Sequence, residues 1–398
     1  MRALLLENLH PQATTILSSA GAEVVTRTGA LDETELIAAL DGVQLLGIRS
    51  KTQVSEAVLA AAGDLVAVGA YCIGTNQIDL RAASERGVAV FNAPFSNTRS
   101  VVEIALAEII ALMRRLTERD RALHAGVWDK SSEGAHEVRG RTLGIVGYGN
   151  IGTQLSVLAE ALGMSVVFHD SAERLALGNA RRMRSLSELL AVADVVTLHV
   201  DGRAGNAGLF GAEEFAQMRP GTVFLNLSRG FVVDYSALRE AVLSGHIAGA
   251  AVDVFTQEPK RRGDSFSSEL RGLANVILTP HIGGSTEEAQ EAIGQFVSTK
   301  LRDYLSTGST TLSVNLPNLA LEARTGVHRL AHLHRNTPGV LAGINQALAE
   351  LGVNIEAQLL ATRADLGYVV TDIGSDLLPQ VRQALQDMPQ TIRLRLLS

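Results

Sequence analysis

Cysteine is almost missing from this chain of 398 residues, which contains only Cys72. A single cysteine excludes an internal disulfide and any metal cluster held by several thiolates, and we expect no metal site. Aromatic residues are also scarce, at 4% of the chain. Because a lone cysteine most often packs as a small hydrophobic residue, Cys72 is expected to be structural.

The chain also lacks a basic excess and a long apolar run. It carries 35 lysines and arginines against 42 acids, a net charge of -7, which argues against a nucleic-acid partner. No run of about eighteen apolar residues is present, so we expect no transmembrane helix and no membrane partner. The first residues reach the acid Glu7 too early for a secretory signal, which predicts a cytoplasmic protein.

What the chain does contain is a glycine-rich turn between a predicted strand and a predicted helix. The apolar run 143–146 is typical of a buried strand, and residues 154–162 have a helical pattern. Between them, Gly147, Gly149 and Gly152 form the pattern GxGxxG. The first glycine allows a tight turn, the second lets the backbone approach a pyrophosphate, and the third lets helix and strand pack closely.

An acid completes this pattern. A second apolar run, 166–168, is followed by His169 and Asp170. A carboxylate at this place can bond the ribose hydroxyls of NAD and would repel the 2'-phosphate of NADP. A GxGxxG alone is a weak signal, because glycine-rich turns are common. The strand, glycines, helix and acid together predict an NAD site.

Residues 1–96 alternate short apolar runs with helical patterns and contain no GxGxxG. This alternation predicts a parallel sheet covered on both faces by helices, without the dinucleotide turn. The expected strands are 4–6, 23–25, 45–48, 65–68 and 88–90, and the expected helices are 11–20, 32–40, 55–62 and 79–86.

A dinucleotide-binding domain is expected at 97–283, entered through one long apolar helix over 100–116. A helix over 287–305 should return the chain to the first domain, which would then comprise 1–96 and 284–325 and end in a linker. Further strands of the NAD domain are expected at 194–199, 222–226, 248–253 and 275–278.

The tail, residues 326–398, differs in character from the rest. Its βαββαβ pattern is that of the ferredoxin-like arrangement, and it shows no obvious catalytic residues, which favours a binding or regulatory role. The expected fold class is therefore α/β, with two doubly wound, Rossmann-like parallel-sheet domains and a C-terminal ferredoxin-like domain. The strands of the tail are expected at 327–333, 355–362, 368–373 and 391–397, and its helices at 339–350 and 378–388.

Three polar residues follow strands of the predicted NAD domain: Arg229, Glu258 and His281. Ligands of open α/β sheets bind at these carboxyl ends. Oxidation of an alcohol by NAD needs a base for the hydroxyl proton, which a histidine paired with a carboxylate can supply. A guanidinium can grip a substrate carboxylate and polarise the carbonyl that forms. Each residue alone would more often be structural or solvated, but their common position predicts a catalytic trio.

Several motifs occur together: the glycine turn with Asp170, Ser228–Gly230, Asp253 with Glu258-Pro259, and Pro280–Thr286. In this combination the sequence resembles the D-isomer-specific 2-hydroxyacid dehydrogenases. The segments 72–77 and 90–100 and the short tail further resemble the bacterial branch of that family that carries one ACT domain. The resemblance runs nearly from end to end.

The resemblance implies NAD-dependent oxidation of 3-phospho-D-glycerate to 3-phosphohydroxypyruvate, the first committed step of L-serine synthesis, in a homotetramer. Reduction of 2-oxoglutarate to 2-hydroxyglutarate is an expected side activity. The family pattern places the catalytic roles on the same trio that the strand ends indicate. The implied cofactor contacts are Gly147, Gly149, Asn150, Ile151, Gly152, Asp170, Leu227, Ser228, Arg229, Asp253, His281, Ile282, Gly283 and Gly284.

The substrate contacts are less sharply implied. Arg49 and Ser50 match the family's anion-binding loop after an N-terminal strand, and Arg49 is expected to bind the phosphate or the carboxylate. Asn97 is expected close to the same cleft, and Lys130 to add positive charge there. An ordinary solvated lysine is the alternative for Lys130.

In the tail, His334 and Asn336 resemble the serine-binding loop of an ACT domain, and Asn354 its partner across a subunit interface. L-serine is therefore an expected effector, although asparagines that merely cap turns remain the alternative. Two departures from the family stand out: Thr325-Gly326 replaces a frequent Gly-Gly hinge, and Asp201 replaces a proline near the nicotinamide.

Two rival functions remain. A D-lactate, glyoxylate or 2-hydroxyglutarate dehydrogenase would use the same scaffold, although the ACT-like tail argues against the first two. A redox-sensing corepressor or scaffold would bind NAD without turnover. The presence of Arg229, Glu258 and His281 together argues against that second class.

Overall fold

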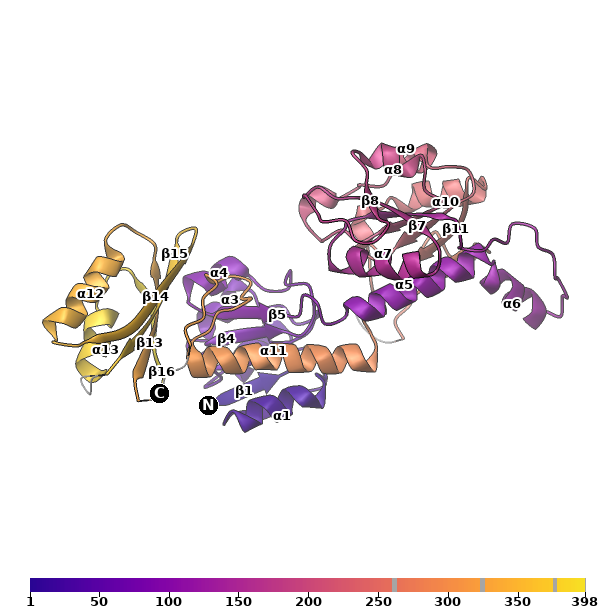
Figure 1. The fold of residues 1–398 in the computed structure, drawn as a ribbon. Coiled ribbons are helices and arrows are strands. Elements are labelled where there is room, and N and C mark those ends of the chain that lie inside the picture. Colours follow the sequence, from indigo (N-terminus) through magenta and orange to yellow (C-terminus); the bar gives the residue numbers. More distant parts are fainter. Residues whose placement is uncertain (260–262, 323–325, 375–377, 398) are drawn as a thin grey trace. The chain divides into compact units, whose positions relative to one another are not determined.

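The computed structural model describes residues 1–259, 263–322, 326–374 and 378–397. They form two compact units, one of Met1–Ser96 with Gln290–Ser398 and one of Asn97–Ala289. Among the described residues lie three β-sheets, with five, seven and four strands (Figure 1). No helix among these residues has the length and hydrophobicity that a membrane span requires.

The first sheet is parallel throughout, in the order β2-β1-β3-β4-β5. Polar N-caps start its helices: the side chains of Asp32, Ser55 and Asp79 each accept a bond from a first-turn N–H group. The strands are β1 Arg2–Leu5, β2 Glu23–Thr26, β3 Leu45–Ile48, β4 Ala67–Ala70 and β5 Ala89–Asn92, and the helices are α1 Pro11–Ser19, α2 Glu33–Ala39, α3 Glu56–Ala61 and α4 Leu80–Glu85.

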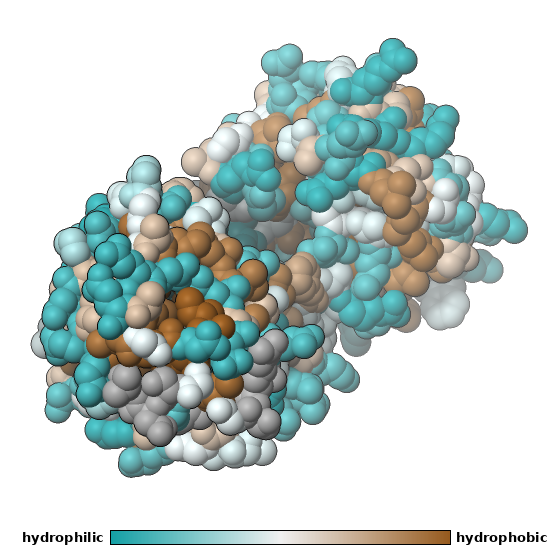
Figure 2. Space-filling model, turned by 60° about the vertical axis from the view of Figure 1, so that its left-hand side comes forward, coloured by the Kyte–Doolittle hydropathy of each residue, from teal (hydrophilic) through white to brown (hydrophobic). Residues whose placement is uncertain are grey.

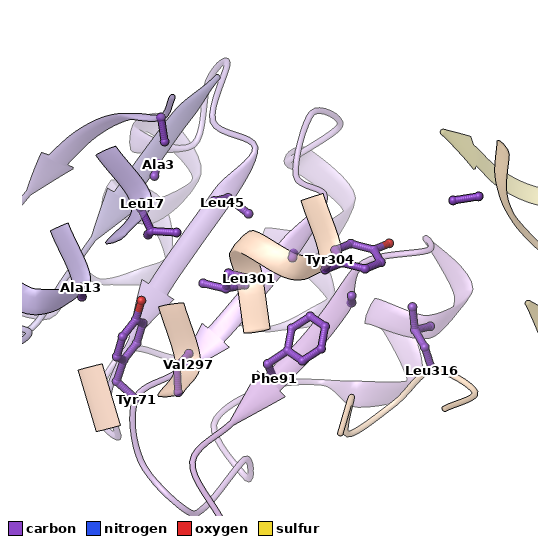
Figure 3. Packing of buried hydrophobic residues seen from close by; sticks show 14 of the residues in the cluster. Ala3, Ala13, Leu17, Leu45, Tyr71, Phe91, Val297, Leu301, Tyr304 and Leu316 are labelled. Atoms are coloured by element: carbon purple, nitrogen blue, oxygen red, sulfur yellow. The ribbon is translucent and has the colours of Figure 1, made fainter. Parts of the chain in front are cut away.

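A long helix, α11 (Glu287–Thr307), covers one face of this sheet from Gln290 onward. Figure 3 shows Val297 of this helix beside Tyr71, which follows β4, and Tyr304 beside Phe91 of β5. The packing is close, since a Cβ on Gly69 of β4 would lie 2.8 Å from Val297. The Tyr71 hydroxyl is also bonded to Ser298 at 2.7 Å.

The second unit contains a seven-stranded parallel sheet in the order β12-β11-β10-β9-β6-β7-β8. The chain runs outward in one direction from β6 to β8 and then in the other from β9 to β12. The switch point, where ligands bind in such sheets, therefore lies between β6 and β9. The strands are β6 Thr142–Val146, β7 Ser165–His169, β8 Arg181–Arg182, β9 Val195–Leu198, β10 Thr222–Asn226, β11 Ile247–Val252 and β12 Val276–Leu278.

The helices of this unit differ from expectation in one place. The helix expected over 100–116 ends at Met113, and a second helix that was not expected follows it after a turn at Arg115, whose φ is 52°. Two bonds from the Arg115 guanidinium to Glu118, of 2.7 and 2.8 Å, hold the start of the second helix. The helices are α5 Thr98–Met113, α6 Leu116–His124, α7 Asn150–Ala161, α8 Leu186–Leu190, α9 Ala212–Gln217 and α10 Tyr235–Leu243.

The third sheet is antiparallel, in the order β14-β15-β13-β16, and belongs to the first unit. One face packs on its own two helices. Residues of the other face, such as Tyr368 and Leu397, share a core with Phe91 and Tyr304. Its elements are β13 His328–Arg335, α12 Val340–Glu350, β14 Ile355–Arg363, β15 Leu366–Ile373, α13 Leu378–Gln386 and β16 Thr391–Leu397.

The expected fold class is confirmed: two doubly wound parallel sheets and a βαββαβ region with an antiparallel sheet. The three-domain division with boundaries at 97, 284 and 326 remains a prediction.

Candidate active site

The glycine turn lies at the switch point, between β6 and α7. Gly147 has a φ of 93°, and a Cβ there would lie 2.7 Å from the His199 carbonyl carbon. A Cβ on Gly152 would overlap the Gly147 carbonyl oxygen. Gly149 is the N-cap of α7, and a Cβ there would meet nothing within 4 Å. The start of α7, with Asn150 and Ile151 in its first turn, therefore borders open space, which suits a pyrophosphate.

Asp170 follows β7 and ties its loop to the glycine turn. Its Oδ2 accepts a bond from the Tyr148 N–H and its Oδ1 one from the Ala172 N–H, both of 2.8 Å. Each oxygen still has a second lone pair for a ribose hydroxyl. The turn, the open helix start and this acid fit a dinucleotide.

His281 and Glu258 form a direct pair. The His281 Nδ1 lies 3.0 and 2.8 Å from the two carboxylate oxygens of Glu258. The Phe255 N–H donates to the same carboxylate at 3.1 Å and fixes its direction. Because Nδ1 is engaged in this bond, Nε2 is the ring nitrogen that can exchange a proton with a substrate.

Each partner shifts the pKa of the other. The hydrogen bond and the charge of Glu258 raise the pKa of His281, against the opposite effects of burial and of Arg229. Burial on its own raises the pKa of Glu258, but the bond and charge of His281, with Phe255 and Arg229, bring it below the ordinary value. The pairing therefore stabilises a protonated imidazole beside an ionised carboxylate.

Arg229 lies beside this pair, since its charge contributes to both pKa shifts. Its Nη1 donates to the Ser228 carbonyl at 2.7 Å. The next residue, Gly230, packs so closely on the loop after β11 that a Cβ there would overlap the Phe255 carbonyl. This contact joins the loop of Arg229 to the loop of Glu258.

Asp253 holds the loop that carries His281. Its carboxylate accepts bonds from the Thr279 hydroxyl at 2.6 Å and from the N–H groups of Ile282 and Gly283 at 2.8 Å. These bonds stabilise the loop around His281, whose φ is 55°, in the left-handed region. Asp253 is 2% exposed, so it acts first as a support for the loop.

A sequence model of the family described as "D-isomer specific 2-hydroxyacid dehydrogenase, NAD binding domain" matches residues 106–283. The D-3-phosphoglycerate dehydrogenase of Escherichia coli (strain K12) is 49% identical over 400 aligned positions, covering 100% of this chain and 97% of that protein. The chain belongs to the D-isomer-specific 2-hydroxyacid dehydrogenases.

Other comparisons agree. The D-3-phosphoglycerate dehydrogenase of Dictyostelium discoideum is 46% identical over 100% of this chain and 97% of its own length. The crystal structure of the D-lactate dehydrogenase from Aquifex aeolicus, complexed with NAD and lactic acid, is 25% identical, with a TM-score of 0.66 over 76% of this chain and 95% of that chain. A model of the "AHAS small subunit-like ACT domain" matches residues 330–393. This dehydrogenase is an oxidoreductase with NAD as its cofactor.

Two residues that support the site were not expected from the sequence of this dehydrogenase. The Asn226 side chain donates to the Arg229 carbonyl and the Tyr235 hydroxyl, each at 3.1 Å, and accepts from Ser228. The Tyr235 hydroxyl donates to the Val254 carbonyl at 2.5 Å. This network joins the ends of β10 and β11. The sequence feature that could have indicated it is a polar residue, Asn226, at the end of an apolar strand.

Glu108 of α5 is a third unexpected residue. It is 4% exposed, and both of its carboxylate oxygens have no hydrogen-bond partner among the described residues. Burial, with a smaller contribution from Asp253, raises its pKa to about 8. Its position in a helical apolar pattern gave no signal, because a glutamate there is usually solvated.

The predicted substrate residues are more dispersed. Asn97 lies against Gly284, where a Cβ would overlap its amide, and its Oδ1 is buried without a partner in the described part of the chain. Lys130 is exposed in the segment after α6. Arg49 and Ser50 follow β3 in the other unit.

Leu227 and Ser228, two of the predicted cofactor contacts, are buried, with 7% and 4% of their surface exposed. They directly precede Arg229 in the chain.

Asp201 stands where the family usually has a proline, and its carboxylate accepts three hydrogen bonds of 2.6 to 3.0 Å from Arg203. Its negative charge is therefore paired. Thr325 lies outside the described residues. No group of three metal-binding side chains was found in the described ranges.

The predicted effector residues lie in the third sheet. His334 of β13 is 2% exposed, and its Nδ1–H donates to the Arg335 carbonyl at 2.8 Å. Its Nε2 has no partner among the described residues. The Asn336 amide donates to the Ala364 carbonyl at 3.1 Å. The Asn354 amide donates to Glu356 at 3.4 Å, just before β14.

Proposed function

We propose that this dehydrogenase oxidises 3-phospho-D-glycerate to 3-phosphohydroxypyruvate and so starts L-serine synthesis, in the cytoplasm. The observation that supports this reaction is the hydrogen bond of 2.8 Å between His281 and Glu258, which provides a base with a partner for its positive charge. The choice of substrate is supported by relatives named D-3-phosphoglycerate dehydrogenase that match 100% of this chain, including the tail.

In the proposed reaction, the substrate hydroxyl gives its proton to Nε2 of His281. NAD held at the glycine turn and Asp170 would supply the acceptor for the hydride of the carbon that bears this hydroxyl, and the electron pair of the broken O–H bond forms the carbonyl. The imidazolium that results is stabilised by Glu258, and its proton returns in the reverse reaction. Arg229 is proposed to bind the substrate carboxylate and to polarise the carbonyl oxygen.

The phosphate and the remaining charge of the substrate need further partners. We propose Arg49 with Ser50 as the first of these, and Asn97 and Lys130 as additional contacts. The Oδ1 of Asn97 is buried without a hydrogen-bond partner among the described residues, which supports its inclusion. Substituting each residue separately and measuring KM for 3-phosphoglycerate against KM for NAD tests these assignments, since an anchor should affect the first constant only.

We further propose that L-serine inhibits the enzyme by binding between two tails in a homotetramer. Within one chain, the strand register places His334 opposite Gly367 at one end of the sheet, and Ile355 beside Ile373 at the other. Asn354 is thus roughly 20 Å from His334. A small ligand that contacts both Asn336 and Asn354 would therefore need these two residues from two different copies of the chain.

The edge of the third sheet offers a surface for such a copy. β14 is an edge strand, with Leu359 and Leu360 exposed by 41% and 37%. Edge strands with free backbone groups tend to pair with another chain. Figure 2 shows apolar side chains gathered among hydrophilic ones on the side of the molecule that is turned toward the viewer.

Formation of NADH at alkaline pH distinguishes the candidate functions. We expect activity with 3-phospho-D-glycerate to exceed that with D-lactate, D-glycerate or D-2-hydroxyglutarate, and 2-oxoglutarate to be reduced as a side reaction. Equal activity with D-glycerate would contradict a role for the phosphate. NADH binding without turnover of any of these acids would favour the scaffold function instead.

A further inference from the structure

A short loop after β9 passes directly beside Arg229. A Cβ on Gly202 of this loop would lie 3.3 Å from the Arg229 Nε. The residues on either side of Gly202 are Asp201 and Arg203, which carry opposite charges. Because β9 borders the switch point, the loop lies at the edge of the sheet where ligands bind. An acid is thus brought close to the guanidinium that is proposed to bind the substrate carboxylate.

Arg229 itself is not paired with an acid. Its Nη1 donates to the Ser228 carbonyl at 2.7 Å, and no ion pair joins it to a carboxylate among the residues that the structure describes. Hydrogen bonding to Arg203 is the main cause that lowers the pKa of Asp201, and the charge of Arg229 adds a smaller effect. Asp201 is therefore close enough to compete with a substrate carboxylate for the same N–H groups.

Asp201 is turned toward its own loop instead. Its carboxylate accepts three bonds of 2.6 to 3.0 Å from the Arg203 side chain and one of 3.2 Å from the Arg203 N–H. The Asn206 amide donates to the same carboxylate and to the Asp201 carbonyl, both at 3.0 Å. All these donors come from the same loop, so the turn closes on the acid and compensates its charge there.

We propose that Arg203 is a positioning residue, which sequesters Asp201 and so keeps Arg229 available for the carboxylate of a D-2-hydroxy acid. The inference rests on the proposed role of Arg229 as the anchor of that carboxylate. Without the Arg203 guanidinium, the acid loses three of its bonds and the charge that compensates it. It then attracts the Arg229 guanidinium and repels the substrate, which is itself an anion. Both effects weaken binding of the substrate.

The KM for the hydroxy acid, measured at saturating NAD and low salt, tests this role. Arg203→Ala should raise KM by about fivefold with kcat nearly retained, because an exposed charge pair acts on binding alone. The increase should shrink as the ionic strength rises, since both groups are exposed and salt screens them. Adding Asp201→Asn to the Arg203 variant removes the competing charge, and KM should return to within about twofold of the wild-type value.

A double variant whose KM stays as high as that of Arg203→Ala overturns the proposal, because removing a charge does not repair a merely disordered loop. An unchanged KM in Arg203→Ala, or an increase confined to the dissociation constant of NADH, overturns it as well. Arg139→Ala is the matched control. Arg139 also pairs with an acid two residues away, Glu137, at 3.1 Å, but it precedes β6 and so lies at the opposite edge of the sheet. It should leave KM unchanged.

The comparison uses the hydroxy acid that the wild-type enzyme oxidises fastest, since every such acid carries the carboxylate. Absence of turnover with 3-phospho-D-glycerate would therefore contradict the proposed substrate but not the role of Arg203. Arg229→Ala tests the premise separately. If that variant keeps the wild-type KM and kcat, Arg229 is not the anchor, and the role of Arg203 is overturned with it.

Discussion

His281 has a left-handed backbone conformation, and Asp253 holds the surrounding loop through three hydrogen bonds. The imidazole direction is therefore set before a substrate binds. If His281 is the acid-base group, His281→Ala should lower turnover by about 10² to 10⁴. NADH should still bind, because the glycine turn remains, and fluorescence titration can measure this. His124→Ala, an exposed histidine of α6, is the control; near-normal turnover of the His281 variant would eliminate the assignment.

The carboxylate of Glu258 raises the pKa of His281. Oxidation requires the unprotonated imidazole, so the acid limb of kcat/KM should lie above the ordinary histidine pKa of about 6.5. In Glu258→Gln the raising effect is lost, and the limb should move to lower pH while the maximal rate falls. A pH–rate profile of both enzymes measures this, and a limb that stays in place would contradict the pairing.

Glu108 predicts a dependence of stability on pH. A folded-state pKa of about 8 means that the native protein keeps this proton when an unfolded chain has already lost it. The contribution of Glu108 to stability is therefore fully present below the ordinary glutamate pKa and is lost as the pH rises through about 8. The loss between about pH 5 and pH 8 is on the order of 3 kcal/mol in free energy of unfolding.

Glu108→Gln cannot ionise and should lose much less stability over this range. Urea unfolding of both proteins at the two pH values measures the difference. Parallel losses in the two proteins would show that Glu108 is ionised or solvated in solution.

At the scale of elements, the contact between two loops positions the trio. Gly230 touches the Phe255 carbonyl so closely that Gly230→Ala must separate the loop of Arg229 from that of Glu258. Small displacements of catalytic groups are costly, so turnover should fall by about a hundredfold. Gly205→Ala is the matched control, because a Cβ there meets nothing within 4 Å. Normal turnover of the Gly230 variant would show that the loops adapt.

The helix break at Arg115 and the short strand β8 are also features of this scale. Both involve arginines. Secondary structure is predicted from the spacing of apolar residues, and polar residues such as these give no such signal. Arg115 ends one helix and holds the next through Glu118. β8 is visible only once β7 is beside it, because two exposed arginines have no apolar periodicity.

At the scale of the whole molecule, the proposed serine site predicts complementation between subunits. Asn336→Ala and Asn354→Ala should each relieve serine inhibition and leave uninhibited turnover nearly intact. In a mixed oligomer of the two variants, an interface between unlike subunits has one site with both substitutions and one with neither. Serine inhibition should therefore partly return on mixing, as measured by turnover against serine concentration.

Two outcomes would contradict a shared serine site. One is wild-type turnover that does not respond to millimolar L-serine. The other is a mixed oligomer, verified by mass, that stays as insensitive as its parents.

The sequence by itself determined the fold class, the glycine turn with Asp170, and the position of Arg229, Glu258 and His281 at strand ends. These are local properties, since periodicity specifies strand or helix, and parallel strands bring their carboxyl ends together. The pairing of His281 with Glu258 followed from chemistry, because a base needs a partner that stabilises its charge.

Only the tertiary structure decided which atoms meet. The support of Arg229 by Asn226 and Tyr235, the burial of Glu108 beside Asp253, and the approach of Gly202 to Arg229 join segments that are distant along the chain or unremarkable in pattern. Side-chain direction and desolvation depend on neighbours brought by other elements. A sequence therefore shows that an acid is present, while its surroundings decide whether that acid keeps its proton.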